Sequence, residues 1–400
     1  MRHRQQRHAA LAVRVGGQHP LHRKSAGQDH ENPELRAVES QREQQCGLGH
    51  LQQRNEDGSL AYTKEGAHST NRIIFHEDVT GKEITSTLLR EVQKLSNVEL
   101  LEYTTMVDIL EKDNHCYGAV IRRPDGSLDT VTATYTVLAS GGVGGLYRHS
   151  TNFRHLTGDA LAIAGKHNIE LQNPDYVQIH PTTFYTKHPE DRSFLISESV
   201  RGEGARLYDK NMNRFVNELL PRDLLSQKIH EQMAKDGTDF VWEDLRTIPA
   251  ETLRHHFPNI VEHCREMGYD VFKECIPVVP AQHYFMGGVK VDYQSRSSME
   301  NLYVVGEAAC NGVHGKNRLA SNSLLESLVF ARRAAQDMAE HDLKNASPQN
   351  AIEVADYLAS HVDFTPYQDI QTLAETYHHL ATQAITLGQN PEGRKEFLYV

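Results

Sequence analysis

Four side chains that can hold a small anion lie at the ends of apolar segments, beside glycine or proline: His180, Arg222, His283 and Arg318. Taken singly, each is most simply a solvated loop residue. Together they suit a small dicarboxylate, because a guanidinium holds a carboxylate through two parallel hydrogen bonds. Glu65, in a loop with His and Gly, would supply the opposite charge. The sequence has no nucleophile elbow, HExxH motif or P-loop, so hydrolase and kinase functions lack support.

Arg318 stands in a glycine-rich loop that joins an apolar run, 301–305, to an amphipathic helical pattern. Ser323 and Glu326 have the spacing of a capping box at the start of that helix. Free N–H groups at such a helix start suit an anionic or electron-rich ligand. The alternative is an ordinary strand–loop–helix connection with a surface arginine.

The bulk properties narrow the class of protein. A length of 400 residues predicts about two or three domains. The net charge of -11 argues against nucleic acid as the main partner. No apolar run reaches the roughly eighteen residues of a membrane span, and the basic N-terminus lacks the apolar stretch of a secretory signal. The five cysteines are scattered without a CxxC pair, which favours reduced thiols and a cytoplasmic location.

Residues 1–54 differ from the rest of the sequence. They carry nine Arg and Lys against five Asp and Glu, so +4 of the chain total of -11, which leaves -15 on the remainder. They contain no Phe, Trp or Tyr and no sustained helical or strand period. Such a segment buries too little apolar surface to offset its ordering entropy. We expect an aberrant, disordered segment, and a stretch translated in the wrong frame is the alternative.

Alternating strand and helix patterns follow. The expected elements are a helix through Leu88–Leu95, strands at 98–103, 106–110 and 116–121, a hairpin turn at 124–126, and a buried strand at 135–139 that runs into the glycines of 140–145. Asp159 precedes an alanine-rich helix, either as its N-cap or as a residue that binds a ligand hydroxyl.

The composition shifts between about 173 and 284, where most prolines and the only Trp occur, and this part is predicted to be an inserted domain with helices at 223–235 and 250–268. Strand and helix alternate again over 289–341, and two amphipathic helices are expected at 349–361 and 366–386.

Six motifs carry a resemblance to a known family, and they span about residues 65 to 340: KEGAHS (64–69), QIHPT (178–182), RGEGA (201–205), PRD (221–223), PVVPAQHYFMGGV (277–289) and VVGEAACNGVHGKNRLASNSLLES (304–327). The sequence resembles the flavoprotein family of L-aspartate oxidase, fumarate reductase and succinate dehydrogenase. The NRLASNSLLE and PVVPAQHY forms are similar to the aspartate oxidase branch, since respiratory members typically have Arg where Val279 stands. KEGAHS favours the same branch.

The resemblance implies roles for the catalytic residues. Arg222 would be the general acid/base at the flavin face, which needs neighbouring charge because arginine ordinarily stays protonated. His180, His283 and Arg318 would clamp the two substrate carboxylates. Glu65 would pair with the substrate ammonium, which succinate and fumarate lack.

The cofactor implied by the resemblance is FAD, with four further residues around it. Glu307 would bind ribityl or ribose hydroxyls. Ser323 and Leu324 would offer N–H groups to the isoalloxazine, and Asp159 would contribute to the FAD site. The implied reaction is oxidation of L-aspartate to iminoaspartate, the first step of de novo NAD biosynthesis. Oxygen or fumarate would reoxidise the flavin, and the product would be handed over to quinolinate synthase.

The expected fold is α/β: an FAD-binding domain of the fumarate reductase/succinate dehydrogenase flavoprotein type, interrupted by an α+β capping domain, with a helical C-terminal tail. The FAD-binding domain would comprise 55–172 and 285–345, the capping domain 173–284, and the C-terminal helical segment 346–400. The family begins with a strand–GxGxxG–helix unit that seats the FAD pyrophosphate. Residues 1–54 contain no such motif, so the first dinucleotide-binding βαβ unit is expected to be missing.

Three functions stay open from the sequence. The first is an L-aspartate oxidase homologue, inactive if the missing FAD motif is needed. The second is a fumarate reductase or succinate dehydrogenase flavoprotein subunit. The third is a non-catalytic truncated fragment.

We predict that the purified chain binds FAD weakly or not at all, because the pyrophosphate would lack the helix N-terminus and glycine loop that normally hold it. The measurement is absorbance in the flavin bands against protein concentration. A stoichiometric flavin spectrum would contradict this prediction.

Overall fold

The computed structural model describes residues 58–59, 62–63, 68–75, 80–187, 192–344 and 349–386. The chain divides into two compact units, one over 11–101 and the other made of 1–10 with 102–400. Segment 1–54 and Glu65 lie outside the described residues. In the smaller unit, β1 (Tyr62–Thr63) pairs antiparallel with β2 (Ile73–Ile74), and α2 (Thr80–Val92) forms where a helix was expected.

An antiparallel sheet begins the larger unit, with β3 (Thr105–Lys112), β4 (His115–Arg122) and β5 (Leu128–Thr132) in that order. The predicted hairpin turn is confirmed: Gly126 has φ +87°, and Asp125 Oδ1 accepts hydrogen bonds from the backbone and hydroxyl of Ser127. The strand expected at 98–103 is wrong. Tyr103 has φ +57° within a turn, a conformation that interrupts an extended strand.

Short parallel pairings join distant parts of the sequence. β6 (Thr136–Leu138) pairs in parallel with β13 (Leu302–Val304), and β12 (Gly288–Lys290) pairs in parallel with β14 (Ala309–Cys310) and antiparallel with β7 (Leu171–Gln172). The turns η2 (Gly144–Leu146) and η3 (Gly306–Ala308) follow β6 and β13. Chain from both sides of the inserted part therefore builds one α/β core, as the expected fold requires.

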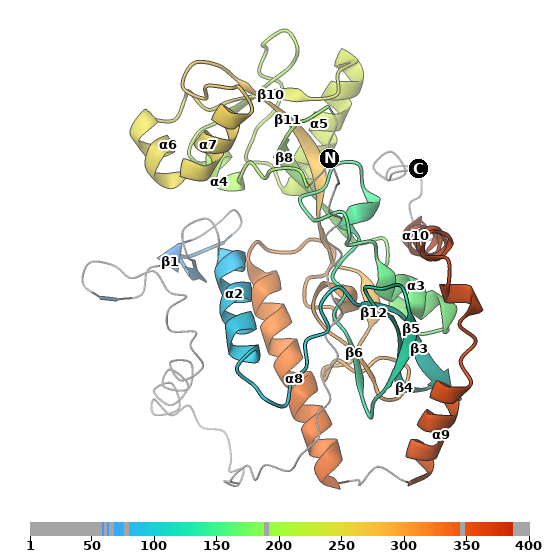
Figure 1. Ribbon diagram of the computed structural model, residues 1–400. Coiled ribbons are helices and arrows are strands. Elements are labelled where there is room, and N and C mark those ends of the chain that lie inside the picture. The colour runs from blue at the N-terminus through green and yellow to red at the C-terminus, as the bar shows by residue number, and fades with distance from the viewer. Residues whose placement is uncertain are drawn as a thin grey trace. The chain divides into compact units, whose positions relative to one another are not determined.

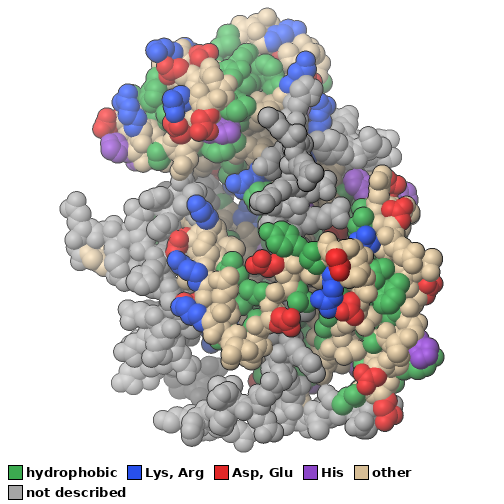
Figure 2. Space-filling model, in the orientation of Figure 1, with side chains coloured by type: hydrophobic (Ala, Val, Ile, Leu, Met, Phe, Trp, Pro, Cys, Tyr) green, Lys and Arg blue, Asp and Glu red, His purple; other side chains and the backbone are tan. Residues whose placement is uncertain are grey.

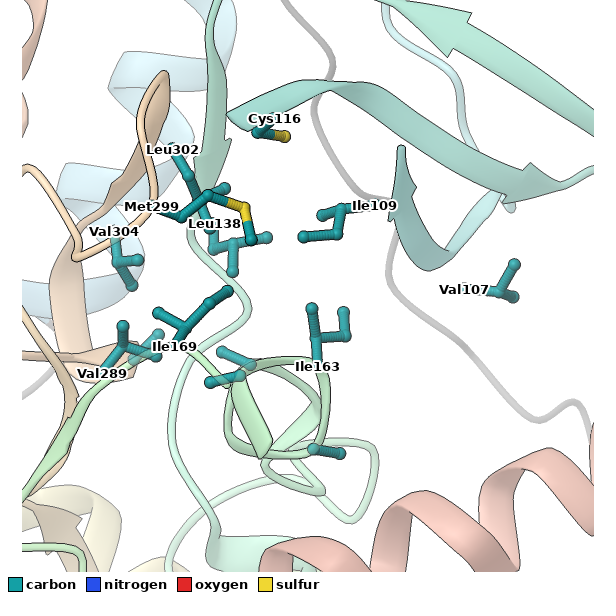
Figure 3. Close-up of a cluster of buried hydrophobic side chains, with 14 of the residues drawn as sticks. Val107, Ile109, Cys116, Leu138, Ile163, Ile169, Val289, Met299, Leu302 and Val304 are labelled. Carbon is teal, nitrogen blue, oxygen red and sulfur yellow. The ribbon is translucent and has the colours of Figure 1, made fainter. Parts of the chain in front are cut away.

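The interior of this α/β part is a cluster of aliphatic side chains from the strands and from α3 (Asp159–Lys166), shown in Figure 3. Ile109 from β3, Leu138 from β6, Ile163 from α3 and Leu302 from β13 lie in it, each at most 4% exposed. Full burial of such a side chain stabilises a fold by about 1.5–3 kcal/mol. The cluster thus stabilises the pairing of β6 with β13, which extends over only three residues.

The inserted part has its own sheet and core. β8 (Val177–Phe184), β11 (Ile276–Phe285), β10 (Val241–Asp244) and β9 (Arg206–Tyr208) form an antiparallel sheet in this order. Four helices accompany it: α4 (Glu198–Gly202), α5 (Arg222–Asp236), α6 (Ala250–His256) and α7 (Pro258–Glu266). We call this sheet with these helices the cap (Figure 1). A second hydrophobic cluster, including Leu207, Leu225 and Val278, lies within it.

The single helix expected at 250–268 is two helices. Phe257 has φ -133° and ψ 46°, outside the helical range, and Pro258 starts α7. The break follows from proline, which disfavours the helical conformation in the residue before it. On the face in Figure 2, acidic and basic side chains are interspersed over the described surface of the cap.

The C-terminal helices confirm the expected pattern. α8 (Asn322–Lys344) is followed by α9 (Gln349–Ser360), the turn η4 (Thr365–Tyr367) and α10 (Ile370–Thr386). α10 packs on α3, and α9 packs on the sheet β3-β4-β5 (Figure 1). The C-terminal segment therefore belongs to the α/β part rather than to the cap.

A buried carboxylate fastens this segment. Asp108 in β3, 1% exposed, accepts hydrogen bonds from Lys166 Nζ, from His167 Nε2 at 2.7 Å and from the Tyr367 hydroxyl at 2.5 Å. Burial alone would raise the pKa of Asp108, but the hydrogen bonds from His167, Lys166 and Tyr367 outweigh it and lower this pKa to about 2. One carboxylate thus joins β3, the end of α3 and η4.

We predict that Asp108→Asn lowers the free energy of unfolding at pH 7 by about 3 kcal/mol, because removing one partner of a buried ion pair leaves the other uncompensated. The folded-state pKa of Asp108 lies below the roughly 3.9 of an unfolded chain, so its contribution is present above pH ~4 and is lost as pH falls toward 2. Urea unfolding at several pH values measures both effects. The control is Glu353→Gln on the exposed face of α9. Equal effects of the two substitutions would contradict the prediction.

Candidate active site

Two histidines face each other on neighbouring strands of the cap, the edge strand β8 and the strand β11 beside it. β8 and β11 are antiparallel with His180 opposite Ala281. The register shifts on either side of this pairing, and the His283 ring lies 5.3 Å from the His180 ring. His180 Nδ1 lies within hydrogen-bonding distance of the Thr182 backbone, and His283 Nδ1 lies 2.8 Å from Thr151 Oγ1. Both rings are therefore held by fixed partners.

Both imidazoles are neutral near pH 7. Burial, followed by the charges of His283 and Arg222, lowers the pKa of His180 well below 6.5. Burial, followed by the charges of Arg318 and Arg222, does the same to the pKa of His283. These electrostatic effects also show that the two arginines lie near the histidine pair.

Arg222 is the first residue of α5, directly after the N-cap Pro221. Its Nε and Nη2 each lie 2.7 Å from Glu198 Oε2, and its Nη1 donates to Gln178 Oε1 at 3.3 Å. Glu198 starts α4, whose N-cap is the Ser197 side chain. The Ser197 hydroxyl accepts the Ser199 N–H, which caps the start of this short helix.

Gln178 connects the two arginines. Its Nε2 donates to Asn317 Oδ1 at 2.7 Å and to the Arg318 carbonyl at 2.8 Å, while its Oε1 accepts from Arg222. Gln178 is 3% exposed, so these bonds are shielded from water. One amide thus relates an arginine of the cap to an arginine in the loop before α8.

Arg318 is buried, as its setting in the sequence suggested, at 6% exposure. Its Nη1 donates to Ser323 Oγ at 3.1 Å, and its Cζ lies over the Tyr284 ring at 4.7 Å from the centroid. The structure therefore brings together His180, Arg222, His283 and Arg318, the four donors that the sequence singled out.

A second group of predicted residues lies next to these donors. Glu307 in η3 accepts the Phe285 N–H at 2.8 Å. Burial raises the pKa of Glu307 to about 7, against the opposing effects of the Phe285 N–H and Arg318. A Cβ at Gly142 would collide with the Glu307 carboxylate, so glycine is needed at this close approach.

Asp159 is placed differently from one of its expected roles. The N-cap of α3 is Gly158, with φ +75°, and Asp159 is the first helical residue. Asp159 accepts the Thr157 hydroxyl at 2.7 Å. The Gly158 N–H donates to the Gly142 carbonyl at 3.2 Å, so Asp159, the next residue after Gly158, lies near the glycine that adjoins Glu307.

The capping box at 323–326 is wrong. α8 begins at Asn322, so Ser323 and Leu324 lie in its first turn. Ser323 accepts from Arg318, and Glu326 accepts from Asn311 Nδ2 at 2.5 Å. Both side chains therefore bond to residues before the helix, and not to each other's backbone N–H groups as a capping box requires.

The described residues fit the flavin end of FAD. The Glu307 carboxylate, which lies against Gly142, can accept a hydroxyl, as a ribityl chain requires. The first turn of α8 carries N–H groups without partners in the helix. Glu65, the predicted partner of an ammonium group, lies outside the described residues. Among those residues, no group of three or more His, Cys, Asp or Glu could hold a metal ion.

Sequence reasoning missed Gln178, Glu198 and Thr151 as members of the site. Gln178 is the first residue of the QIHPT motif, and Glu198 lies just before the RGEGA motif. Their position in or beside a motif was the available signal. Nothing in the sequence pointed to Thr151.

A family model described as FAD binding domain matches residues 4–324, so the match begins within segment 1–54 and ends in the first turn of α8. L-aspartate oxidase of Clostridium perfringens is 50% identical over 291 residues, which are 73% of this chain and 66% of that protein. L-aspartate oxidase of Clostridium acetobutylicum is 48% identical over 285 residues, which are 71% of this chain and 65% of that protein. The chain thus spans just under two thirds of the length of these relatives.

Solved structures agree on the fold. A structure of Escherichia coli quinol fumarate reductase superposes with a TM-score of 0.71 at 27% identity, covering 88% of this chain and 72% of that one. No helix within the described ranges is long and apolar enough to cross a bilayer. By the family match and by this fold, the chain belongs to the FAD-binding domain family of flavoproteins, with the architecture of the fumarate reductase/succinate dehydrogenase flavoproteins.

Proposed function

We propose that this chain oxidises L-aspartate to iminoaspartate with FAD as the electron acceptor, the first step of de novo NAD biosynthesis. The observation that carries the proposal is the joining of Arg222 and Arg318 through Gln178 beside the His180–His283 pair. The relatives at 48–50% identity are L-aspartate oxidases, which supports the choice of substrate.

Binding of the substrate would divide its two carboxylates among fixed donors. Arg318 offers a planar fork that matches one carboxylate. His180 and His283, which are neutral, can donate N–H groups without adding charge. Glu65 is proposed as the partner of the substrate ammonium, on the family resemblance.

Oxidation removes a hydride from the substrate Cα and a proton from its nitrogen, which leaves a protonated imine. FAD, when bound, supplies the acceptor for the hydride. Arg222 is the group placed to relay the proton: its guanidinium would release one proton to the Glu198 carboxylate, 2.7 Å from Nε and Nη2, and take the proton of the substrate nitrogen in its place. Beyond Glu198 lies Arg201, 2% exposed, whose guanidinium donates to the Thr182 hydroxyl. Burial lowers the pKa of Arg201, and the charges of Glu243, Glu198 and Arg222 act on the same guanidinium.

Oxygen or fumarate is proposed as the oxidant of the reduced flavin, and quinolinate synthase as the enzyme that receives the product. The alternative, a respiratory fumarate reductase or succinate dehydrogenase subunit, is favoured by the fold of the Escherichia coli quinol fumarate reductase structure. Val279, where respiratory members typically have arginine, argues against it. Val279 lies buried in β11, 2% exposed.

We predict that the chain with excess FAD oxidises L-aspartate and leaves succinate unchanged, because only an amino acid carries the ammonium that Glu65 would bind. Excess FAD keeps weak cofactor binding from limiting the assay. Oxygen consumption and product formation are measured with each substrate. Turnover of succinate without turnover of L-aspartate would establish the alternative.

We predict that Arg222→Gln lowers kcat for L-aspartate by about 10²–10⁴-fold, the usual contribution of a positioned proton-transfer group. Glu198→Gln is expected to lower kcat by a smaller factor, since Arg222 stays in place. The matched control is Arg254→Gln, an exposed arginine in α6 that pairs with Glu251 at 4.0 Å. Steady-state kinetics give kcat and KM for each variant. An Arg222→Gln variant with the kcat of the control would refute the assignment.

A further inference from the structure

Tyr284, the residue after His283, has no role so far, yet it is buried in the site at 7% exposure. Its ring lies beneath Arg318, with Cζ 4.7 Å from the ring centroid. His314 meets the same ring edge-on, with centroids 5.4 Å apart. The π-face of Tyr284 is therefore turned toward the arginine that would hold a substrate carboxylate.

The hydroxyl end of Tyr284 lies near a buried carboxylate. Glu326, 5% exposed, accepts from Asn311 Nδ2 at 2.5 Å, and its charge acts on Tyr284. Burial, followed by the charges of Glu307 and Glu326, raises the pKa of Tyr284, so the phenol stays protonated and can donate. Burial and the edge-on contact with His314 anchor the ring.

Arg318 is consequently held at three points. Its backbone carbonyl accepts from Gln178, its Nη1 donates to Ser323 in α8, and its guanidinium face lies over a ring that is itself buried. A flat guanidinium stacked on an anchored ring keeps one plane, and the direction of its donors is set before a ligand arrives. Pre-ordering of a long side chain removes an entropic cost that binding would otherwise carry.

We propose that Tyr284 is a positioning residue that orients the Arg318 guanidinium toward a carboxylate of a dicarboxylate substrate. The inference rests on the proposed function, because it assigns a substrate carboxylate to Arg318. It adds that the anchored ring beneath Arg318, and not the arginine alone, sets the affinity for the dicarboxylate.

The test compares variants that separate the ring from the hydroxyl. Tyr284→Leu and Tyr284→Met remove the π-face and keep apolar bulk, while Tyr284→Phe keeps the ring and loses the hydroxyl. Tyr293→Leu is the matched control, because Tyr293 also carries an arginine over its ring, with Arg333 Cζ at 3.7 Å, but is 64% exposed and belongs to neither group of site residues.

The probe is malonate, which has two carboxylates. It cannot be oxidised as L-aspartate or succinate would be, because it has no amino group and only one carbon between the carboxylates. Its dissociation constant is measured by titration calorimetry in excess FAD, beside kcat and KM for L-aspartate. We expect Tyr284→Leu and Tyr284→Met to weaken malonate binding by about 3- to 30-fold, as loss of a desolvated cation–π contact implies, and to raise KM more than they lower kcat. Tyr284→Phe should stay within about threefold of the unsubstituted chain, and Tyr293→Leu should match it.

Thermal melts confirm that each variant is folded. If the unsubstituted chain binds no malonate, the proposed function fails, and the inference fails with it. If the unsubstituted chain binds malonate and a folded variant without the ring binds it equally well, the inference is overturned while the proposed function stands. A fall in kcat with unchanged malonate binding and KM would also overturn it.

Discussion

The antiparallel pairing of β8 with β11 is the interaction on which the site depends. These strands carry the Gln178 amide, both histidines and Tyr284, and their register decides which side chains meet. The register shifts twice along this pair, and the second shift leaves His283 as an extra residue of β11 between the pairs Gln282–Ile179 and Tyr284–Gln178. Bulges of this kind change the direction of side chains at functional sites. Here β11 supplies two neighbouring residues: the His283 ring lies against His180, and the Tyr284 ring lies beneath Arg318.

The parallel pairing of β6 with β13 supplies the complementary half. The glycines after β6 and Glu307 after β13 come together because the carboxyl ends of adjacent parallel strands meet at one edge. The cap is inserted between these two strands in the sequence, so its long strands start and finish beside that edge: Phe285, the last residue of β11, donates its N–H to Glu307. The core in Figure 3 stabilises this arrangement with side chains from both sides of the insertion.

Local patterns predicted the helices and the hairpin, whose signals lie within a few residues. They failed where distant partners decide the outcome. The spacing of Ser323 and Glu326 satisfies the capping box. In the structure, however, the Ser323 hydroxyl accepts a hydrogen bond from Arg318, and the Glu326 carboxylate accepts one from Asn311. No strand forms at 98–103, where Tyr103 has a positive φ. The residue types of this segment did not indicate that backbone conformation. For the site, the residue types were predictable, but the pairing of Arg222 with Glu198 and Gln178, 24 and 44 positions away, depends on the folded cap.

The two arginines are distinguished by what touches them rather than by their type. A carboxylate contacts Arg222 through Nε and Nη2, which gives it a group that can exchange a proton. Arg318 donates to a hydroxyl and stacks on an aromatic ring, contacts that fix direction without offering a proton acceptor of similar strength. Since Gln178 bonds to the side chain of one and to the backbone of the other, a displacement of the cap would alter both at once. The proton transfer proposed for Arg222 and the carboxylate binding proposed for Arg318 would therefore be coupled through a single buried amide.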